Sequence, residues 1–295
     1  MSLSGAISLR NIIQRFCRPI SITLALVVLE NIALAMIPLL IGFAIDDLLA
    51  GSATALLQLA MCLMFLVAVA VIRRIYDTRI YGAIRVNMGL LIEQRSPNLP
   101  VSTRNARLDM VRELVDFLEE EMPELITAIV QAVIALIILA SFHHYLALSA
   151  ILLTLLMLLF YALFHGRFYR LNAALNGQRE QQVSVLDSGR RSRLRHHLLR
   201  LKQSEVRLSD TEAITYGSIF LLATVFIIAN LWGSVGLPEV SAGSIFSIVT
   251  YSWEYVSAAI MLPICLQTLT RLQEITLRIN HPASTPHRSN ELPPL

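Results

Sequence analysis

The sequence predicts an all-α membrane protein with six transmembrane helices and long cytoplasmic helical hairpins. Hydrophobic residues make up 55% of the 295 residues and charged residues only 15%, against roughly 25% charged residues in a soluble domain. The mean hydropathy is +0.62. A helix that crosses the roughly 30 Å hydrocarbon core of a bilayer needs about 20 apolar residues. Six segments meet this requirement, at about 20–49, 56–72, 125–142, 145–164, 213–231 and 245–266.

The basic residues predict the orientation of these spans. All 24 Lys and Arg residues lie before the first span, in the polar segments 73–124 and 165–212, or after the sixth span, and the three opposite links contain none. Cytoplasmic loops carry the excess of Lys and Arg, so both termini and both polar segments are predicted to be cytoplasmic, in a bacterial-type inner membrane. This topology explains the net charge of +3 without a nucleic-acid partner, and carboxylates such as those of 119–121 interrupt any basic stripe.

The first half of the chain is predicted to be helical outside the membrane as well. Residues 1–19 form an interfacial elbow helix, because apolar residues recur at helical spacing among three arginines. The short link after the first span requires a helical hairpin. The first run of apolar residues has no small-residue cleavage site, so we expect it to stay as a membrane anchor. The segment 73–124 is interpreted as two helices that meet at a turn near Pro97 and Pro100.

The second half follows the same pattern. The segment 167–210 is predicted to be helical with a break near Asp187 and Gly189, and Ser209 or Asp210 is expected to cap the fifth span. The sixth span continues as a polar helix to Asn280. The tail 281–295 is rich in proline and polar residues and is predicted to be disordered.

Several segments resemble the transmembrane domain of ABC exporters. They are MIPLLIGFAIDDLLAG in the first span, VDFLEEEMPELI before the third span, and SAGSIFSIVTYSWEYVSAAIMLP with LQEITLRIN in and after the sixth. The resemblance covers nearly all of residues 8–280. It implies a homodimer of twelve helices in which spans four and five cross to pack against the partner. It also implies a central cavity lined partly by spans one and six.

The sequence departs from that family in its cytoplasmic parts. It contains no GxxxxGK[ST] phosphate loop and no LSGGQ-like signature, so we do not expect this chain to hydrolyse ATP alone. The segments VSTRNARLDMVREL and VLDSGRRSRLRHHLLRL also differ from those with which exporters contact the ATPase. A separately encoded ATPase partner remains an alternative.

A polar face of the sixth span is the first candidate site. Its members recur every three or four residues and therefore share one side of a helix: Ser247, Thr250, Tyr251, Glu254 and Ser257. No Lys or Arg lies in a predicted span to neutralise Glu254. We expect this carboxylate to bind a cation or a proton, with Tyr251, Trp253 and Tyr255 offering rings for cation-π contacts. The alternative is an acid that is hydrogen-bonded inside the helix bundle.

Glu30 and Asn31 form the second candidate site. They lie about ten residues into the first span, or about 15 Å deep at 1.5 Å per residue. The alternative is an acid in a wet cytoplasmic mouth or in an interhelical contact. Gln131 and Asn230 are interpreted as interhelical hydrogen-bonding residues.

Other polar residues offer weaker signals. Asp46 and Asp47, at the outer end of the first span, either attract cations or are simply solvated. His143 and His144 have no partner residues that would indicate a metal site. We expect no catalytic residues, no metal and no cofactor, so the protein is not expected to be an enzyme.

The leading functional hypothesis is a transporter without its own ATPase, which moves a small solute or a cation across the membrane and is coupled to a proton or ion gradient. One alternative is a cation channel on the same fold, because an acid-lined cavity that opens at both ends would conduct. The other is a membrane subunit that recruits a separate ATPase. The expected partners are membrane lipid, a second copy of the chain and the transported solute.

Overall fold

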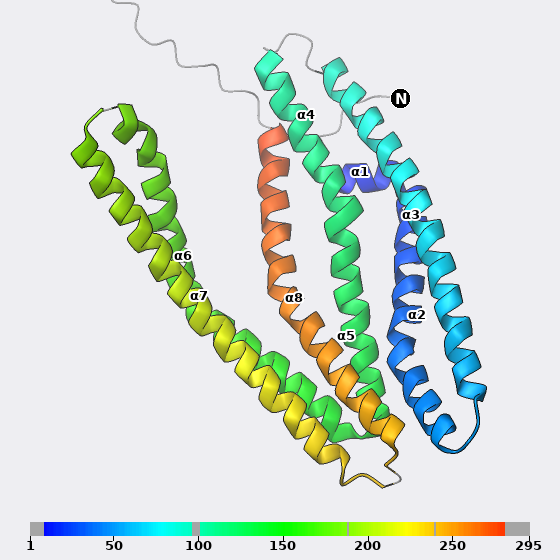
Figure 1. Ribbon diagram of the computed structural model, residues 1–295. Helices are drawn as coiled ribbons and strands as arrows, with labels where there is room; N and C mark the ends of the chain where they lie inside the picture. Colours follow the sequence, from blue (N-terminus) through cyan, green and yellow to red (C-terminus); the bar gives the residue numbers. More distant parts are fainter. Residues whose placement is uncertain (1–8, 96–100, 188, 239, 281–295) are drawn as a thin grey trace, which may run out of the picture. The chain divides into compact units, whose positions relative to one another are not determined.

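The computed structural model describes residues 9–95, 101–187, 189–238 and 240–280, with the backbone alone for 262–280. Nearly all of these residues are helical, and no strand occurs among them (Figure 1). The elements are α1 Leu9–Arg15, α2 Cys17–Leu49, α3 Thr54–Arg95, α4 Val101–Asp116, the π-helical turn η1 Phe117–Glu121, α5 Met122–Phe142, α6 His144–Asp187, α7 Arg191–Ser234 and α8 Ala242–Asn280. The predicted all-α class is confirmed.

Five helices of the described chain are long and apolar enough to cross a membrane. They are Cys17–Leu49, Thr54–Gln94, Leu108–Phe142, His144–Phe164 and Arg191–Ser234, and each contains one of the first five predicted spans. The sixth predicted span, 245–266, lies within α8, where side chains beyond Met261 are outside the described residues. That span therefore stays a prediction.

Most of the predicted helix boundaries coincide with turns in the structure. α6 ends at Asp187, and Gly189 adopts φ +62°, a left-handed conformation that glycine reaches without strain. This confirms the predicted break in the second polar segment. The proline turn and the C-terminal tail were predicted at 96–100 and 281–295, and both stretches lie outside the described residues, as do residues 1–8 of the elbow segment.

The predicted cap of the fifth span is wrong. α7 is continuous from Arg191 to Ser234, so Ser209 and Asp210 lie inside a helix and not before one. Two threonines compensate for the polar interruption, because the hydroxyl of Thr211 donates to the carbonyl of Arg207 at 2.9 Å and that of Thr215 to the carbonyl of Thr211 at 2.8 Å. Such back-bonding satisfies the hydroxyls without breaking the helix.

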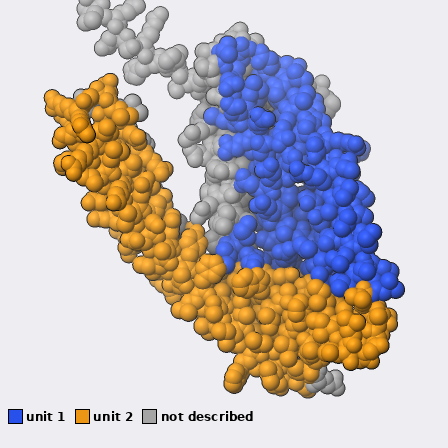
Figure 2. Space-filling view, viewed as in Figure 1, with its two compact units in different colours: residues 1–37, 57–132, 257–295 blue, residues 38–56, 133–256 orange. Residues whose placement is uncertain are grey.

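The chain forms two compact units, which Figure 2 distinguishes by colour. Unit 1 comprises residues 1–37, 57–132 and 257–295, and unit 2 comprises residues 38–56 and 133–256. Four long helices, α2, α3, α5 and α8, contribute to both units. Each unit has its own buried residues and its own side-chain hydrogen bonds.

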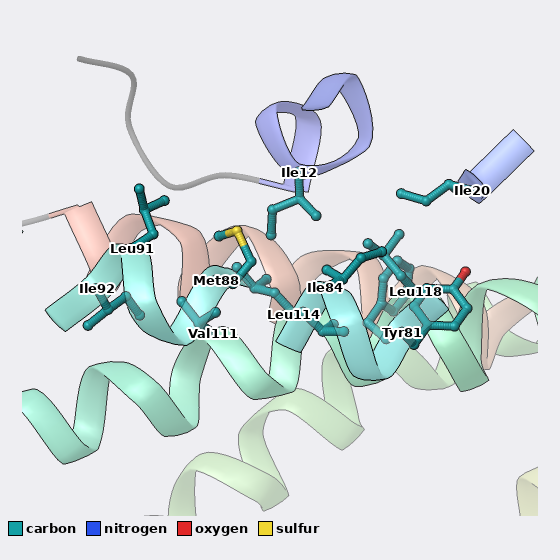
Figure 3. Packing of buried hydrophobic residues seen from close by; sticks show 12 residues of the cluster. Ile12, Ile20, Tyr81, Ile84, Met88, Leu91, Ile92, Val111, Leu114 and Leu118 are labelled. Carbon is teal, nitrogen blue, oxygen red and sulfur yellow. The ribbon is translucent and has the colours of Figure 1, made fainter. Parts of the chain in front are cut away.

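The core of unit 1 joins the first helix to the hairpin of α3 and α4. Ile12 of α1 points toward side chains of α3 and α4 (Figure 3). The buried residues recur at helical spacing, so each helix presents one apolar stripe: Tyr81, Ile84, Met88 and Ile92 on α3, and Val111, Leu114, Val115 and Leu118 on α4 and η1. This packing explains why the polar segment 73–124 folds as a pair of helices.

Unit 2 is built on the long hairpin of α6 and α7, which run side by side (Figure 1). α7 buries a residue almost every fourth position, and the stripe consists of Thr211, Thr215, Ile219, Ala223, Phe226, Asn230 and Ser234. Most of these side chains are small, which permits close packing of the two helices.

Candidate functional site

Unit 1 contains a cavity of about 540 Å³, a size typical of small-ligand sites. Residues from α2, α3, η1, α5 and α8 line it. Its polar lining consists of Glu30, Asn31, Arg73, Arg74, Glu119, Glu120, Glu124, Thr127, Gln131 and Ser257. Four carboxylates therefore face two guanidinium groups, which gives the wall a formal excess of negative charge.

Glu30, one of the predicted site residues, is ion-paired in this wall. Its carboxylate accepts from the Nε of Arg73, and Arg73 also lies 3.5 Å from Asp77. The hydroxyl of buried Thr23 donates to Asp77 at 2.8 Å. Asp77 lies beyond the predicted span 56–72, and burial raises its pKa, an effect that the Thr23 hydrogen bond and the charge of Arg73 oppose. One arginine thus holds two carboxylates on α2 and α3.

Sequence reasoning missed Arg73 as the partner of Glu30, although the hairpin contains a signal for it. Glu30 lies nineteen residues before the end of α2 at Leu49, and Arg73 lies nineteen residues after the start of α3 at Thr54. Two antiparallel helices of equal rise place such residues at the same level. Glu30 therefore lies level with Arg73, the first residue after the predicted span 56–72, and its depth in a membrane stays a prediction.

Asn31 links two helices beside the same cavity. It is 5% exposed, and its Nδ2 donates to the carbonyl of Val27 and to the hydroxyl of Thr127 on α5, each at 2.8 Å. The predicted pair Glu30 and Asn31 therefore does line a cavity, with the amide fixed between α2 and α5. Gln131, one turn beyond Thr127, also lines it.

The π-helical turn η1 supplies the acidic side of the cavity. Such turns add a residue to a helix and occur frequently at functional sites. Glu119 and Glu120 lie within η1, and Glu124 follows one turn later. Arg85 of α3 is ion-paired with Glu119 and with Asp116. Glu119 lies before the predicted span 125–142, and burial raises its pKa, whereas the charge of Arg85 opposes that shift.

The other predicted site residues lie on the part of α8 that belongs to unit 2. Ser247 is 1% exposed, and its hydroxyl donates to the carbonyl of Pro38 at 3.2 Å. Tyr251 is fully buried, whereas Trp253 is 62% exposed and lies on another side of the helix. The Oε2 atom of Glu254 is buried and has no hydrogen-bond partner among the described residues. On the polar face of α8, Ser247 is therefore hydrogen-bonded, whereas Glu254 has one oxygen without a partner among the described residues.

Tyr255 and Asn230 hold unit 2 together. The hydroxyls of Tyr255 and Thr154 lie 2.7 Å apart. Asn230 is 1% exposed, accepts from Ser149 of α6 at 2.8 Å and donates to Ser252 of α8 at 2.9 Å. The predicted interhelical role of Asn230 is confirmed, since its amide joins α6, α7 and α8. Tyr255 is likewise an interhelical contact and is 7% exposed.

Asp46 and Asp47 serve as helix caps. Asp46 accepts from the backbone N–H of Gly243 at 2.8 Å and from the hydroxyl of Ser241 at 2.6 Å, at the start of α8. Asp47 accepts from the N–H of Ala55 at 2.8 Å, at the start of α3. A carboxylate at a helix N-terminus satisfies free N–H groups and complements the helix dipole. Capping accounts for both acids without a bound cation.

Metal-ligand clusters are not found in the part of the chain that the structure describes, where no three His, Cys, Asp or Glu residues gather closely enough. The rings of His143 and His144 lie with their centroids 4.1 Å apart and their planes tilted by 34°.

Comparison with known protein families places the chain beside transporters. The family described as "ABC transporter transmembrane region" matches residues 9–243. The matched range contains α1 to α7 and ends at the second residue of α8, so Glu254 lies beyond it. No curated protein matches the chain.

Proposed function

The chain belongs to the ABC transporter transmembrane region family, and from this membership we propose that it moves a small solute or a cation across the membrane through the cavity of unit 1, driven by a proton or ion gradient. The observation that carries the proposal is that cavity. Ion-paired and unpaired charges line one space of about 540 Å³ between helices. Among these charged residues Glu30 lies in a predicted span, and ionisable residues within membrane spans mark solute or ion pathways.

Within this proposal Glu30 and Glu254 have different roles. Glu30 and Arg73 form a pair that a cation or a proton opens by competing for the carboxylate, and Asp77 then retains the arginine. Glu254 supports coupling, because a buried carboxylate oxygen without a partner favours a proton or a bound cation. Tyr251, Trp253, Asn31 and Ser247 complete the proposed set as orienting residues.

ATP-independent flux is consistent with the sequence, in which no phosphate loop occurs. A homodimer in the bacterial-type inner membrane, with both termini cytoplasmic, is part of the proposal. A separate ATPase remains a possible partner of a member of this family, and a nucleotide-binding protein that co-purifies at a fixed ratio would support that alternative.

A cavity-filling variant tests the proposal. Gln131→Trp places a bulky ring in the cavity without removing a carboxylate, and it should lower solute flux into ATP-free liposomes by at least about tenfold. Ile137→Trp is the matched control on the same helix, because Ile137 is 61% exposed. Equal flux through both variants would show that the cavity is not the path.

A cation channel is the second candidate, and the excess of carboxylates over guanidinium groups in the cavity wall favours it. Carriers change conformation in every cycle, on the microsecond to millisecond scale or slower. Single-channel currents across a planar bilayer would therefore establish a channel, whereas flux that saturates at low turnover would support a carrier.

A further inference from the structure

Two of the four carboxylates in the cavity wall of unit 1 have no cationic partner. Glu30 and Glu119 are ion-paired with arginines of α3. Glu120 and Glu124 line the same wall, and they form neither an ion pair nor a hydrogen bond with the described residues. Arg74 is the remaining guanidinium of the wall, and its charge acts on Glu119. Two negative charges of the wall therefore stay available to a ligand.

A buried amide oxygen adds to these acceptors. Asn31 is 5% exposed, and its Nδ2 donates to the carbonyl of Val27 and to the hydroxyl of Thr127. Because a carbonyl only accepts, the Nδ2 must face Val27, which fixes the orientation of the amide. The Oδ1 atom accepts no hydrogen bond from the described residues, and it is not among their fully buried atoms without a partner. This oxygen therefore opens into the cavity that Asn31 lines.

The available polar groups follow one side of the helix that η1 and α5 form. We call four residues that line the cavity the acceptor row: Glu120, Glu124, Thr127 and Gln131. Their spacing of four, three and four residues places them on one helix face, and at 1.5 Å per residue the row is about 16 Å long. Asn31 meets the row at Thr127. The amide of Gln131 forms no hydrogen bond with the described residues, so both ends of the row are free to bind.

The acceptor row matches a ligand that donates hydrogen bonds and carries positive charge. An ammonium group has three donors and no acceptor, and a carboxylate binds it through charge-assisted hydrogen bonds. An anion would be repelled by the unpaired carboxylates. Ca²⁺ takes roughly six to eight oxygen ligands, whereas no three His, Cys, Asp or Glu residues gather in the described chain. An amine is therefore favoured over a divalent metal ion.

The rest of the lining favours an unbranched aliphatic ligand. Quaternary ammonium ligands are recognised by aromatic rings, and the described residues that line the cavity include no aromatic side chain. The apolar part of the lining is aliphatic, and it consists of Val27, Leu34, Pro123, Ala128, Ala258 and Met261. Such side chains contact methylene groups. Because the acceptors are spread along a row, they suit positive charges that are spaced along a chain.

We propose that the cavity of unit 1 binds a linear aliphatic polyamine, which extends along the acceptor row with ammonium groups at Glu120, Glu124 and the amides of Asn31 and Gln131. The inference rests on the proposed function, in which this cavity is the transport path, and it names the class of the solute. One helical turn rises about 5.4 Å, which is about the length of a short methylene segment between two nitrogens. A tetraamine such as spermine has three such segments, or about 16 Å in all, and so matches the length of the row.

Equilibrium binding of radiolabelled spermine to the full-length protein in a neutral detergent tests the ligand class without requiring transport. Native protein should bind spermine saturably, and the shorter triamine spermidine should compete. Tetraethylammonium and Mg²⁺ should not compete at matched ionic strength, because neither presents N–H donors along a chain. Bound spermine should also raise the unfolding temperature of the native protein, since a ligand of the folded state stabilises it.

Two carboxylate variants locate the site. Glu120→Gln and Glu124→Gln should each raise the Kd for spermine at least about tenfold, because each removes a charge-assisted hydrogen bond. Glu121→Gln is the matched control, because Glu121 belongs to the same turn and lies outside the described lining of the cavity. It should keep the native Kd.

Gln131→Leu separates binding along a row from binding at one charged point. It removes the amide at the far end of the row and nearly keeps the side-chain volume. The Kd for spermine should rise at least about tenfold, because a hydrogen bond to a charged group is lost. The Kd for 1,4-diaminobutane should stay as in the native protein, because this diamine is too short to reach from Glu120 to Gln131. Thermal unfolding of each variant without ligand shows whether it is folded.

The outcomes distinguish this inference from the proposed function. Absence of saturable spermine binding, equal Kd values in the row variants and in Glu121→Gln, or displacement of spermine by Mg²⁺ at matched ionic strength would each overturn the polyamine. If cation flux in liposomes still depended on Glu30 and Glu254, transport would stand without this class of solute. Spermine that binds through the row and does not enter liposomes would confirm the site and contradict transport through the cavity.

Discussion

At the scale of single residues, Arg73 is the group on which the polar wall of unit 1 depends. It pairs with Glu30 and with Asp77, whose side chains are 19% and 6% exposed. Arg73→Gln leaves both carboxylates without their cation, so we expect the free energy of unfolding to fall by about 1–3 kcal/mol, less than for a fully buried pair. Thermal unfolding in detergent measures this change.

Arg79→Gln is the control for that variant, because Arg79 is an exposed arginine of the same helix. It should change the stability by less than about 0.5 kcal/mol. Equal stability of the two variants would show that the ion pairs of Arg73 do not contribute to the free energy of unfolding.

Glu254 should show a conflict between stability and activity. Its Oε2 is buried without a hydrogen-bond partner, and an unsatisfied buried polar atom destabilises a fold by about 1–3 kcal/mol. Glu254→Met removes that penalty and keeps the volume, so we expect a higher unfolding temperature together with loss of gradient-driven flux. Both are measured on the same purified protein, and a lower unfolding temperature would instead indicate that the acid stabilises the bundle.

At the scale of elements, α2 and α8 approach each other closely at two glycines of unit 2. A Cβ atom on Gly42 would lie 2.6 Å from the carbonyl oxygen of Gly243, and one on Gly243 would lie 2.6 Å from the Asp46 carboxylate that caps α8. Gly243→Ala must therefore push the helices apart and weaken the cap, and we expect a loss of about 1–3 kcal/mol in unfolding free energy. Thermal unfolding again provides the measurement.

Gly217→Ala is expected to have the opposite effect on the unfolding free energy. Gly217 lies within α7, and a Cβ there would meet no atom within 4 Å. Alanine has the higher helix propensity, so this variant should gain up to about 1 kcal/mol. If Gly217→Ala lowered the unfolding free energy as much as Gly243→Ala, the close approach of α2 and α8 could not be the cause of the loss at Gly243.

The helices were predictable from the sequence where apolar periodicity was strong, and their ends were predictable where glycine breaks the chain. Asp187 and Gly189 illustrate the second case. The cap predicted at Ser209 or Asp210 was wrong because α7 runs through both residues, so a run of polar residues does not imply a helix end. Contacts between helices were harder to predict. Apolar periodicity identifies which side of a helix is buried, but it does not identify the helix that packs against that side.

The candidate site shows the same limit. Glu30 and Asn31 were identified as polar residues in an apolar segment, and both line the cavity. The acids of η1 were considered as an interruption of the basic charge, and Arg85 was not identified as the partner of Glu119, because a π-helical turn has no clear sequence signal. Asp46 and Asp47 were not recognised as caps because neither acid directly precedes the helix that it caps.

At the scale of the whole molecule, the apolar helices and the membership of the family together indicate a transporter-type function. The family match ends where α8 begins, whereas one of the proposed coupling residues, Glu254, lies within α8. The cavity residues of α2, α3 and α5 lie inside the matched range. The proposal therefore combines a cavity in the shared part of the family with an acid on a helix beyond it.

The most direct test is proton and monovalent-cation flux in ATP-free liposomes that contain only this protein. Native protein is compared with Glu254→Gln and Glu30→Gln, and with Glu205→Gln as a control on an exposed carboxylate of α7. The proposal predicts flux under an imposed gradient that falls at least about tenfold in the first two variants and is unchanged in the control. Flux that persists undiminished in Glu254→Gln and Glu30→Gln, or no flux by the native protein under any imposed gradient, would contradict ion-coupled transport through these carboxylates.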